Sequence, residues 1–248
     1  GRLMVARSSD GSFRDLLPGL EGHVSGFQWR DDRTLAYVAD EGVETRIGEV
    51  GVDGSNDRTR IEGGEVVLAG MSAPVGVETA AFIGQTPMHP SELYVGTGSS
   101  APRRMTDSNP WLANRKLAPQ EVVEWTAADG LRLEGLLIKP LDGRRSAPTI
   151  VVVHGGPEAH QRNGWLTGYS SPGQVAAADG FAVFYPNYRA STGRGVEFSM
   201  LDHGDFAGKE FDDIVDGVDH LIGSGVTDSA RVGVTGGSYG GYATGWLT

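Results

Sequence analysis

The fold of the second half of the chain is decided by the stretch Arg231-Val-Gly-Val-Thr-Gly-Gly-Ser-Tyr-Gly-Gly-Tyr242. Its apolar run leads directly into Gly236-Gly-Ser-Tyr-Gly240, which matches the pattern G-x-S-x-G. In that pattern a serine lies on a strained turn between a buried strand and a helix. We expect small residues at 236, 237, 240 and 241 because a Cβ there would collide with the neighbouring backbone. The stretch therefore predicts a strand, a turn at Ser238 and a helix after it.

Upstream of this turn, strand patterns alternate with helix patterns. The predicted elements are a hairpin of Glu121–Thr126 and Leu131–Lys139, strands at Thr149–Val153, Phe181–Tyr185 and Arg231–Thr235, and helices at Gly173–Asp179 and Lys209–Ile222. On the longer helix, one face is expected to carry Phe211, Ile214, Val215, Val218, Leu221 and Ile222. Strands that alternate with helices are typical of a parallel sheet covered by helices. This half is predicted to be α/β.

The first half is predicted to be all-β. Two similar strands, Thr34–Ala39 and Thr79–Gly84, begin 45 positions apart, and each is followed by two further strands. Those further strands are predicted at Thr45–Val50, Arg58–Ile61, Glu92–Val95 and Arg103–Met105. A repeat of this length with several strands is typical of a β-propeller, whose blades bury their faces only by stacking. A small β-sandwich with an accidental repeat is the alternative.

These patterns divide the chain into three parts. Residues 1–107 are predicted to be the C-terminal blades of a propeller, with Leu3–Arg7 and Phe13–Leu17 ending a preceding blade. Residues 108–120 have prolines near both ends and predict a linker with one helical turn. Residues 121–248 are predicted to be the α/β part.

The residues after two of the predicted strands have the character of a hydrolytic site. Ser238 is the candidate nucleophile, and His154-Gly155-Gly156-Pro157 follows the run 149–153. A glycine pair there leaves backbone N–H groups unpaired, so the N–H groups of Gly156 and Tyr239 are the candidate oxyanion donors. An ordinary strand-ending turn is the alternative for residues 154–157. We reject His154 as the general base, because it belongs to this loop and α/β-hydrolases run in the order Ser, acid, His.

Together these stretches resemble the prolyl oligopeptidase family of serine peptidases, most closely its acylaminoacyl-peptidase and dipeptidyl-aminopeptidase-like branch. The matching stretches are Val153–Pro157, Gly180–Gly193, Phe211–Ile222 and Gly236–Tyr242, with Leu93–Val95 and Met105–Asp107 in the first half. The resemblance implies a propeller that admits only short peptides, ahead of an α/β-hydrolase domain. It implies that Ser238 is the nucleophile and that the N–H groups of Tyr239 and Gly156 hold the oxyanion.

The chain departs from the family pattern in two places. Ala190 stands where the pattern Asn-Tyr-Arg is usually followed by Gly. All six histidines precede Ser238, whereas the family's Asp and His follow the serine. Without a base a serine hydroxyl is a poor nucleophile. We therefore expect an internal fragment, a partial propeller plus the N-terminal half of an α/β-hydrolase domain, which is catalytically inactive by itself and leaves one edge of an apolar strand open.

Composition excludes other classes. The net charge of −11 argues against nucleic-acid partners, and no apolar run is long enough for a membrane span. Cysteine is absent, which excludes disulfides and thiolate sites. No cofactor or metal is expected: Gly96–Ala101 is followed by Pro102 and not by a helix, and the acids Glu210, Asp212, Asp213 and Asp216 are expected to form a solvated helix face. We expect a cytoplasmic protein.

The leading hypothesis is a serine peptidase that acts on short peptides through an acyl-enzyme on Ser238. An esterase or lipase is the first alternative, since the same turn serves esters and amides. The β-rich first half argues against it, because simple esterases need no propeller. A non-catalytic propeller module that binds a partner is the other alternative.

Overall fold

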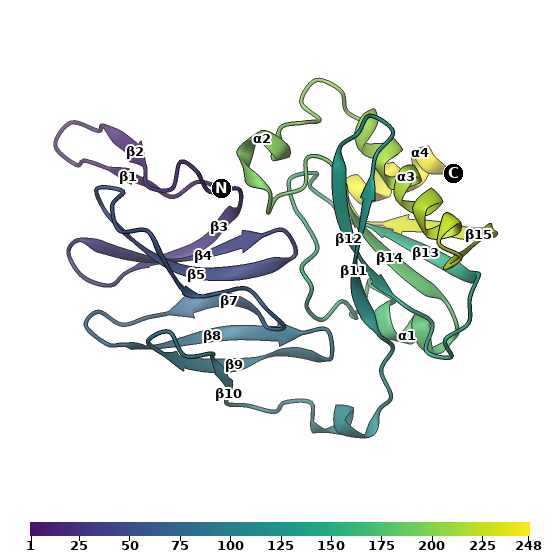
Figure 1. Cartoon of the computed structure of the whole chain (residues 1–248), viewed down its shortest axis with the longest axis horizontal. Coiled ribbons are helices and arrows are strands. Elements are labelled where there is room, and N and C mark those ends of the chain that lie inside the picture. Colours follow the sequence, from purple (N-terminus) through teal and green to yellow (C-terminus); the bar gives the residue numbers. More distant parts are fainter. The chain divides into compact units, whose positions relative to one another are not determined.

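The computed structural model describes residues 1–248, which divide into two compact units (Figure 1). The first unit comprises residues 1–112 and 192–196, and the second comprises residues 113–191 and 197–248. A short 3-10 helix, η1 (Pro110–Asn114), supplies the helical turn predicted for this part of the chain. No helix is both long enough and apolar enough to cross a membrane.

The first unit is built from antiparallel strands. Four consecutive strands form one sheet, β3 (His23–Trp29), β4 (Thr34–Glu41), β5 (Glu44–Gly51) and β6 (Arg58–Ile61). The next four form a second sheet, β7 (Val67–Ser72), β8 (Thr79–Thr86), β9 (His89–Thr97) and β10 (Arg103–Arg104). A two-stranded ribbon of β1 (Met4–Ala6) and β2 (Phe13–Asp15) precedes them. The predicted all-β repeat is therefore confirmed as two four-stranded units in sequence order.

The sequence missed the first strand of each repeat, and both of these strands carry a bulge. In β3 the register shifts between Val24 and Gly26, and in β7 it shifts between Ala69 and Met71. The extra residues are Ser25 and Gly70, which are again 45 positions apart. A bulge interrupts the two-residue alternation by which a strand is identified in sequence. The bulge thus occurs at the same position in both 45-residue repeats.

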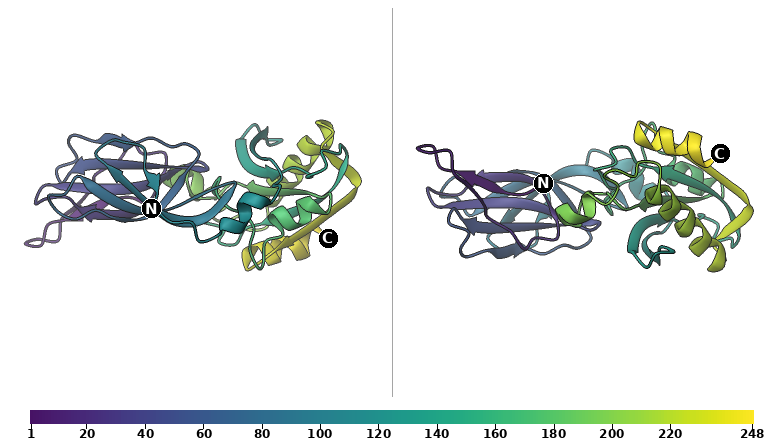
Figure 2. Two further views of the ribbon diagram at one scale, coloured as in Figure 1. Left: turned by 90° about the horizontal axis from the view of Figure 1, so that it is seen from below. Right: turned by 90° about the horizontal axis from the view of Figure 1, so that it is seen from above.

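The two four-stranded sheets pack on each other through an apolar layer (Figures 1 and 2). Val38 and Ile47 from the first sheet contact Leu68, Phe82 and Tyr94 from the second. The opposite face of the first sheet is covered as well, by a cluster that includes Leu3, Leu16 and Leu17 with Tyr37 and Val50. Each sheet thus buries a face only because a neighbouring element covers it.

The second unit is organised around one five-stranded sheet. Its strands, in spatial order, are β11 (Gln120–Thr126), β12 (Arg132–Ile138), β14 (Ala182–Asn187), β13 (Ala147–Val153) and β15 (Thr227–Gly236). Its helices are α1 (Gly173–Ala178), α3 (Lys209–Gly223) and α4 (Tyr239–Leu247), and α2 (Gly195–Ser199) begins in the segment that belongs to the first unit and ends in the second. β13 runs parallel to β14 and β15, as predicted, whereas β12 pairs antiparallel with β11 and β14. The sheet is therefore mixed, and α2 had no signal in the sequence.

Both faces of this sheet are covered by helices. Phe184 of β14 packs edge-on against Trp125, with ring centroids 5.4 Å apart, and a Cβ on Gly217 of α3 would lie 3.0 Å from its ring. The next residue, Tyr185, points to the other face, where its hydroxyl accepts a hydrogen bond from the N–H of Gly173 in α1. Since neighbouring strand residues point to opposite faces, the buried run of β14 needs a helix on each side.

The expected solvated acidic face of α3 is wrong for two of its four residues. Asp212 is exposed, but Glu210 and Asp213 are completely buried. Val215, which was expected on the buried face, is 45% exposed. Helical periodicity separates apolar from polar positions, but it does not show that a distant segment supplies a partner for a buried carboxylate.

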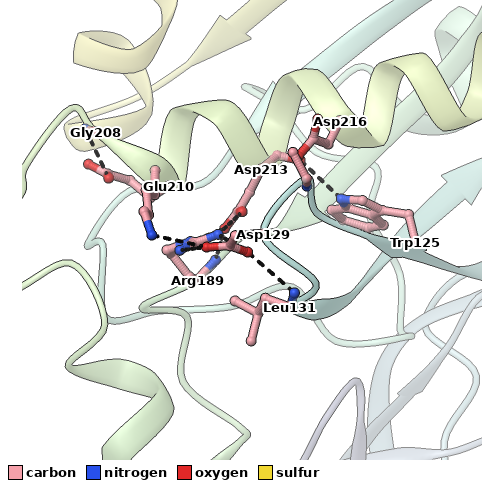
Figure 3. Close-up of polar contacts among 10 residues, drawn as sticks. Trp125, Asp129, Leu131, Arg189, Gly208, Glu210, Asp213 and Asp216 are labelled. Carbon is pink, nitrogen blue, oxygen red and sulfur yellow. Dashed lines mark hydrogen bonds and ion pairs between the residues drawn. The ribbon is translucent and has the colours of Figure 1, made fainter.

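For Asp213 that partner is Arg189, directly after Asn187 and Tyr188 at the end of β14 (Figure 3). The guanidinium of Arg189 donates to both oxygens of Asp213, at 2.8 and 2.6 Å, and also to Asp129 in the β11–β12 turn. Lys209 donates to Asp129 as well. Arg189 and Lys209 hold the pKa of Asp129 well below its usual range, whereas burial raises the pKa of Asp213 against the pull of Arg189. The network joins α3, the end of β14 and the hairpin turn.

We expect Asp213→Asn to lower the free energy of unfolding by about 3–5 kcal/mol, because it leaves the buried Arg189 guanidinium without its closest charge partner. Asp212→Asn, at the exposed neighbouring position of α3, is the matched control and should change stability by less than about 0.5 kcal/mol. Urea unfolding followed by tryptophan fluorescence measures both. Equal midpoints for the two variants would show that Arg189 does not depend on Asp213.

Candidate active site

Ser238 lies on a strained turn between β15 and α4. Its backbone angles are φ 55° and ψ −123°, a combination that non-glycine residues rarely adopt, and α4 begins at the next residue. Figure 2 shows α4, in yellow, next to the last strand. The predicted order of strand, turn and helix around Ser238 is therefore present.

The glycines around the turn do not all have the same role. A Cβ on Gly236 would lie 2.5 Å from the carbonyl oxygen of Val153, and a Cβ on Gly240 would collide with the same oxygen. Gly237 has open space where its Cβ would be, and a Cβ on Gly241 would make only an ordinary contact. The steric prediction is correct at 236 and 240 and wrong at 237 and 241, because only the first two face the end of β13.

The loop after β13 packs against the serine. Val153 pairs with Gly236 in the parallel ladder, so the chain that leaves β13 arrives beside the turn that leaves β15. A Cβ on Gly155 would lie 3.1 Å from Cβ of Ser238 and 3.6 Å from its Oγ. No residue of the chain accepts a hydrogen bond from the backbone N–H of Gly156 or from that of Tyr239. The loop and the turn therefore present two unpaired donors.

His154 is part of the support of this loop. It is buried, it stacks on Tyr188 with centroids 4.4 Å apart, and burial lowers its pKa to about 4. Its Nδ1 lies 2.9 Å from the carbonyl oxygen of Gly155, and its Nε2 lies 3.0 Å from Oγ of Ser191. Tyr188 donates its hydroxyl hydrogen to the carbonyl oxygen of His154. The imidazole is thus neutral near pH 7 and is bonded to Ser191, whereas the hydroxyl of Ser238 has no hydrogen bond within the chain.

Ala190 occupies a backbone conformation that favours glycine. Its φ is 72°, in the left-handed region, and the residue is completely buried. In that region an L-residue pays a steric cost that glycine avoids. The departure at Ala190 is therefore a matter of backbone strain in the segment after β14.

Sequence reasoning missed two buried polar side chains of this region, Glu210 and Asp202. Glu210 accepts hydrogen bonds from the N–H groups of Ala207 and Gly208 and from the hydroxyl of Tyr239. Asp202 is buried with neither carboxylate oxygen hydrogen bonded, and burial raises its pKa. These residues follow no local pattern, so only their position in the folded unit reveals them.

Side chains with a metal-binding spacing occur elsewhere, in the first unit. His89, Glu92 and Asp107 place one ligand atom each within 4.8 Å of one another. The oxygens of Glu92 already accept hydrogen bonds from Thr106 and Ser108, and His89 contacts Asp107. Glu92 thus binds the segment that follows β10 and ties it to β9.

The part of the chain that contains Ser238 is similar to known peptidases. Residues 168–248 match the model of the prolyl oligopeptidase family. The uncharacterized peptidase YuxL of Bacillus subtilis is 37% identical over 165 residues, which are 65% of this chain and 24% of that protein. Dipeptidyl aminopeptidase BIII of Pseudoxanthomonas mexicana is 38% identical over 149 residues, which are 57% of this chain and 21% of that protein. The chain thus spans about a quarter of the length of these relatives.

Solved structures of acylaminoacyl peptidases match a larger part of the chain. The acylaminoacyl peptidase of Pyrococcus horikoshii superposes with a TM-score of 0.80 at 26% identity, over 96% of this chain and 37% of that one. An acylaminoacyl peptidase in complex with Z-Gly-Gly-Phe-chloromethyl ketone matches with the same TM-score of 0.80 at 27% identity, over 96% of this chain and 37% of that one. The family model that matches residues 168–248, which carry Ser238, is thus the one that the sequence resemblance predicted.

Proposed function

We propose that the protein is a serine peptidase that hydrolyses short peptides through an acyl-enzyme on Ser238. The observation that carries the proposal is the junction at Ser238: a strained serine, packed against the loop at Gly155, beside two unpaired N–H groups. An exposed serine on such a turn, with donors that await negative charge, is suited to acyl transfer.

In this mechanism Oγ of Ser238 attacks the peptide carbonyl carbon and loses its proton to a general base. The oxygen that becomes negative is held by the N–H groups of Gly156 and Tyr239. The C–N bond then breaks, the amine leaves with the proton, and water releases the acyl group in the reverse sequence. We propose that His154 is not this base, because it is buried, neutral near pH 7 and bonded to Ser191.

The proposed substrate class follows from the first unit. We propose that residues 1–107 are blades of a propeller, that 108–120 is a linker, and that 121–248 is the first part of an α/β-hydrolase domain. Two stacked four-stranded sheets in a repeat of 45 residues support this, as does the match over 96% of the chain. In the family that the sequence resembles, the propeller ahead of the hydrolase domain restricts access by size, so short acylaminoacyl, dipeptidyl or oligopeptide substrates are expected.

Ser238→Ala in the full-length protein should lower turnover by about 10⁶-fold and leave the fold intact, because it removes the nucleophile. Labelling by a fluorophosphonate probe should disappear with it. Ser229→Ala, at an exposed serine of the same strand, is the control and should be labelled like the parent. Undiminished labelling of Ser238→Ala would assign the nucleophile to another residue.

The full-length protein should cleave chromogenic acylaminoacyl, dipeptidyl or short oligopeptide amides, and it should leave folded globular proteins nearly untouched. The comparison uses one peptide sequence, free and embedded in a folded host, with product release measured by mass spectrometry. Rapid hydrolysis of long-chain esters without amide cleavage would instead identify an esterase or lipase. Absence of both activities, with an intact fold, would favour a non-catalytic binding module.

A further inference from the structure

A buried carboxylate holds the side chain of the residue that follows the nucleophile. Tyr239 is the first residue of α4, and its hydroxyl donates to Oε1 of Glu210 at 2.6 Å. Glu210 lies in the first turn of α3, with no exposed surface. The contact therefore ties the start of α4 to the start of α3.

Glu210 has two further hydrogen-bond partners, and their role does not require the bond to Tyr239. Its carboxylate accepts hydrogen bonds from the N–H of Ala207 and, at 3.1 Å, from that of Gly208 (Figure 3). Those two bonds go to the amides just before α3, as is usual for an acid in the first turn of a helix, and the N–H of Gly208 also donates to the carbonyl oxygen of Asp205. A capping role needs no tyrosine. The bond to Tyr239 is a third, and it reaches a residue 29 positions away.

The side chain of Tyr239 is held by ring packing as well as by the hydrogen bond to Glu210. Its ring packs against Phe211 and Tyr242, with centroids 5.7 Å away in each case, and against Phe206 at 6.4 Å. Burial and the bond to Glu210 raise the pKa of the Tyr239 hydroxyl, so it remains a donor. With the ring packed and the hydroxyl bonded, the orientation of the Tyr239 backbone is set from both ends of the side chain.

We propose that Glu210 is a positioning residue for catalysis: by holding the Tyr239 hydroxyl, it fixes the direction of the Tyr239 backbone N–H that receives the oxyanion. The inference rests on the proposed function of Ser238. A strained backbone such as that of Ser238 persists only where its surroundings over-determine it, and the anchored Tyr239 is one such constraint. Loss of an oxyanion donor costs about 10²–10³ in turnover, so a misdirected donor should cost somewhat less.

The test compares Tyr239→Phe and Glu210→Gln in the full-length enzyme, with Asp212→Asn as control. Tyr239→Phe removes only the hydroxyl and keeps the ring and the backbone N–H. We expect kcat to fall about 10- to 100-fold, with KM unchanged within about twofold. The inhibition constant of a peptide aldehyde, which forms a tetrahedral adduct, should rise by the same factor as kcat/KM falls. That of a non-reactive product peptide should not change.

Further measurements separate positioning from folding. Saturating fluorophosphonate labelling at long incubation counts the folded active sites, and it should be complete for each variant. If Glu210→Gln does not reach completion, Tyr239→Phe alone decides. The double variant should be no slower than the slower of the two single variants, because both changes act on the contact between Tyr239 and residue 210.

Two results would overturn the inference. One is a kcat and an aldehyde inhibition constant for Tyr239→Phe equal to those of the parent. The other is a change confined to KM and to the product peptide, which would make the contact a determinant of substrate binding. Failure of the parent enzyme to be labelled at Ser238 would instead refute the proposed function itself, so the two failures are distinguishable.

Discussion

The candidate site depends on a close approach of two backbones, at the end of β13 and at the turn after β15. Parallel pairing of Val153 with Gly236 brings both strand ends to the same edge of the sheet. The carbonyl oxygen of Val153 leaves no space for a Cβ at Gly236 or Gly240. Because both residues are glycines, the chain can turn sharply at Ser238. The same approach brings Gly155 against Ser238 and leaves the N–H groups of Gly156 and Tyr239 unpaired. One packing constraint thereby produces the strained serine and its neighbouring donors together.

Helix α3 stabilises the segments around this junction through two buried carboxylates. Glu210 and Asp213 are three positions apart and lie on the same side of the helix. Asp213 binds Arg189, which follows β14, and Glu210 binds Tyr239, which follows β15. A buried carboxylate is costly unless hydrogen bonds satisfy it, and both residues have such bonds from other segments. The helix therefore holds the residues that follow two of the parallel strands.

The repeat of the first unit shows how far local pattern extends. The second, third and fourth strands of each repeat were predicted, from the similar runs Thr34–Ala39 and Thr79–Gly84, which begin 45 positions apart, and from the two strands after each. The first strands, which were missed, each carry a bulge, at Ser25 and at Gly70. Stacking of the two sheets through Val38, Leu68 and Phe82 then gives each repeat the covered face that it cannot build alone.

By itself, the sequence determined the elements whose signals are local: the alternating strands, the helix 209–222, the turn at Ser238 and the glycine loop after residue 153. These follow from side-chain periodicity and from the space that glycine leaves, and both are properties of neighbouring residues. Only the tertiary structure decided that Glu210 and Asp213 are buried, that His154 is bonded to Ser191, and that Gly237 faces open space. Each of these depends on segments distant in sequence, since burial and hydrogen bonding are set by what the fold brings into contact.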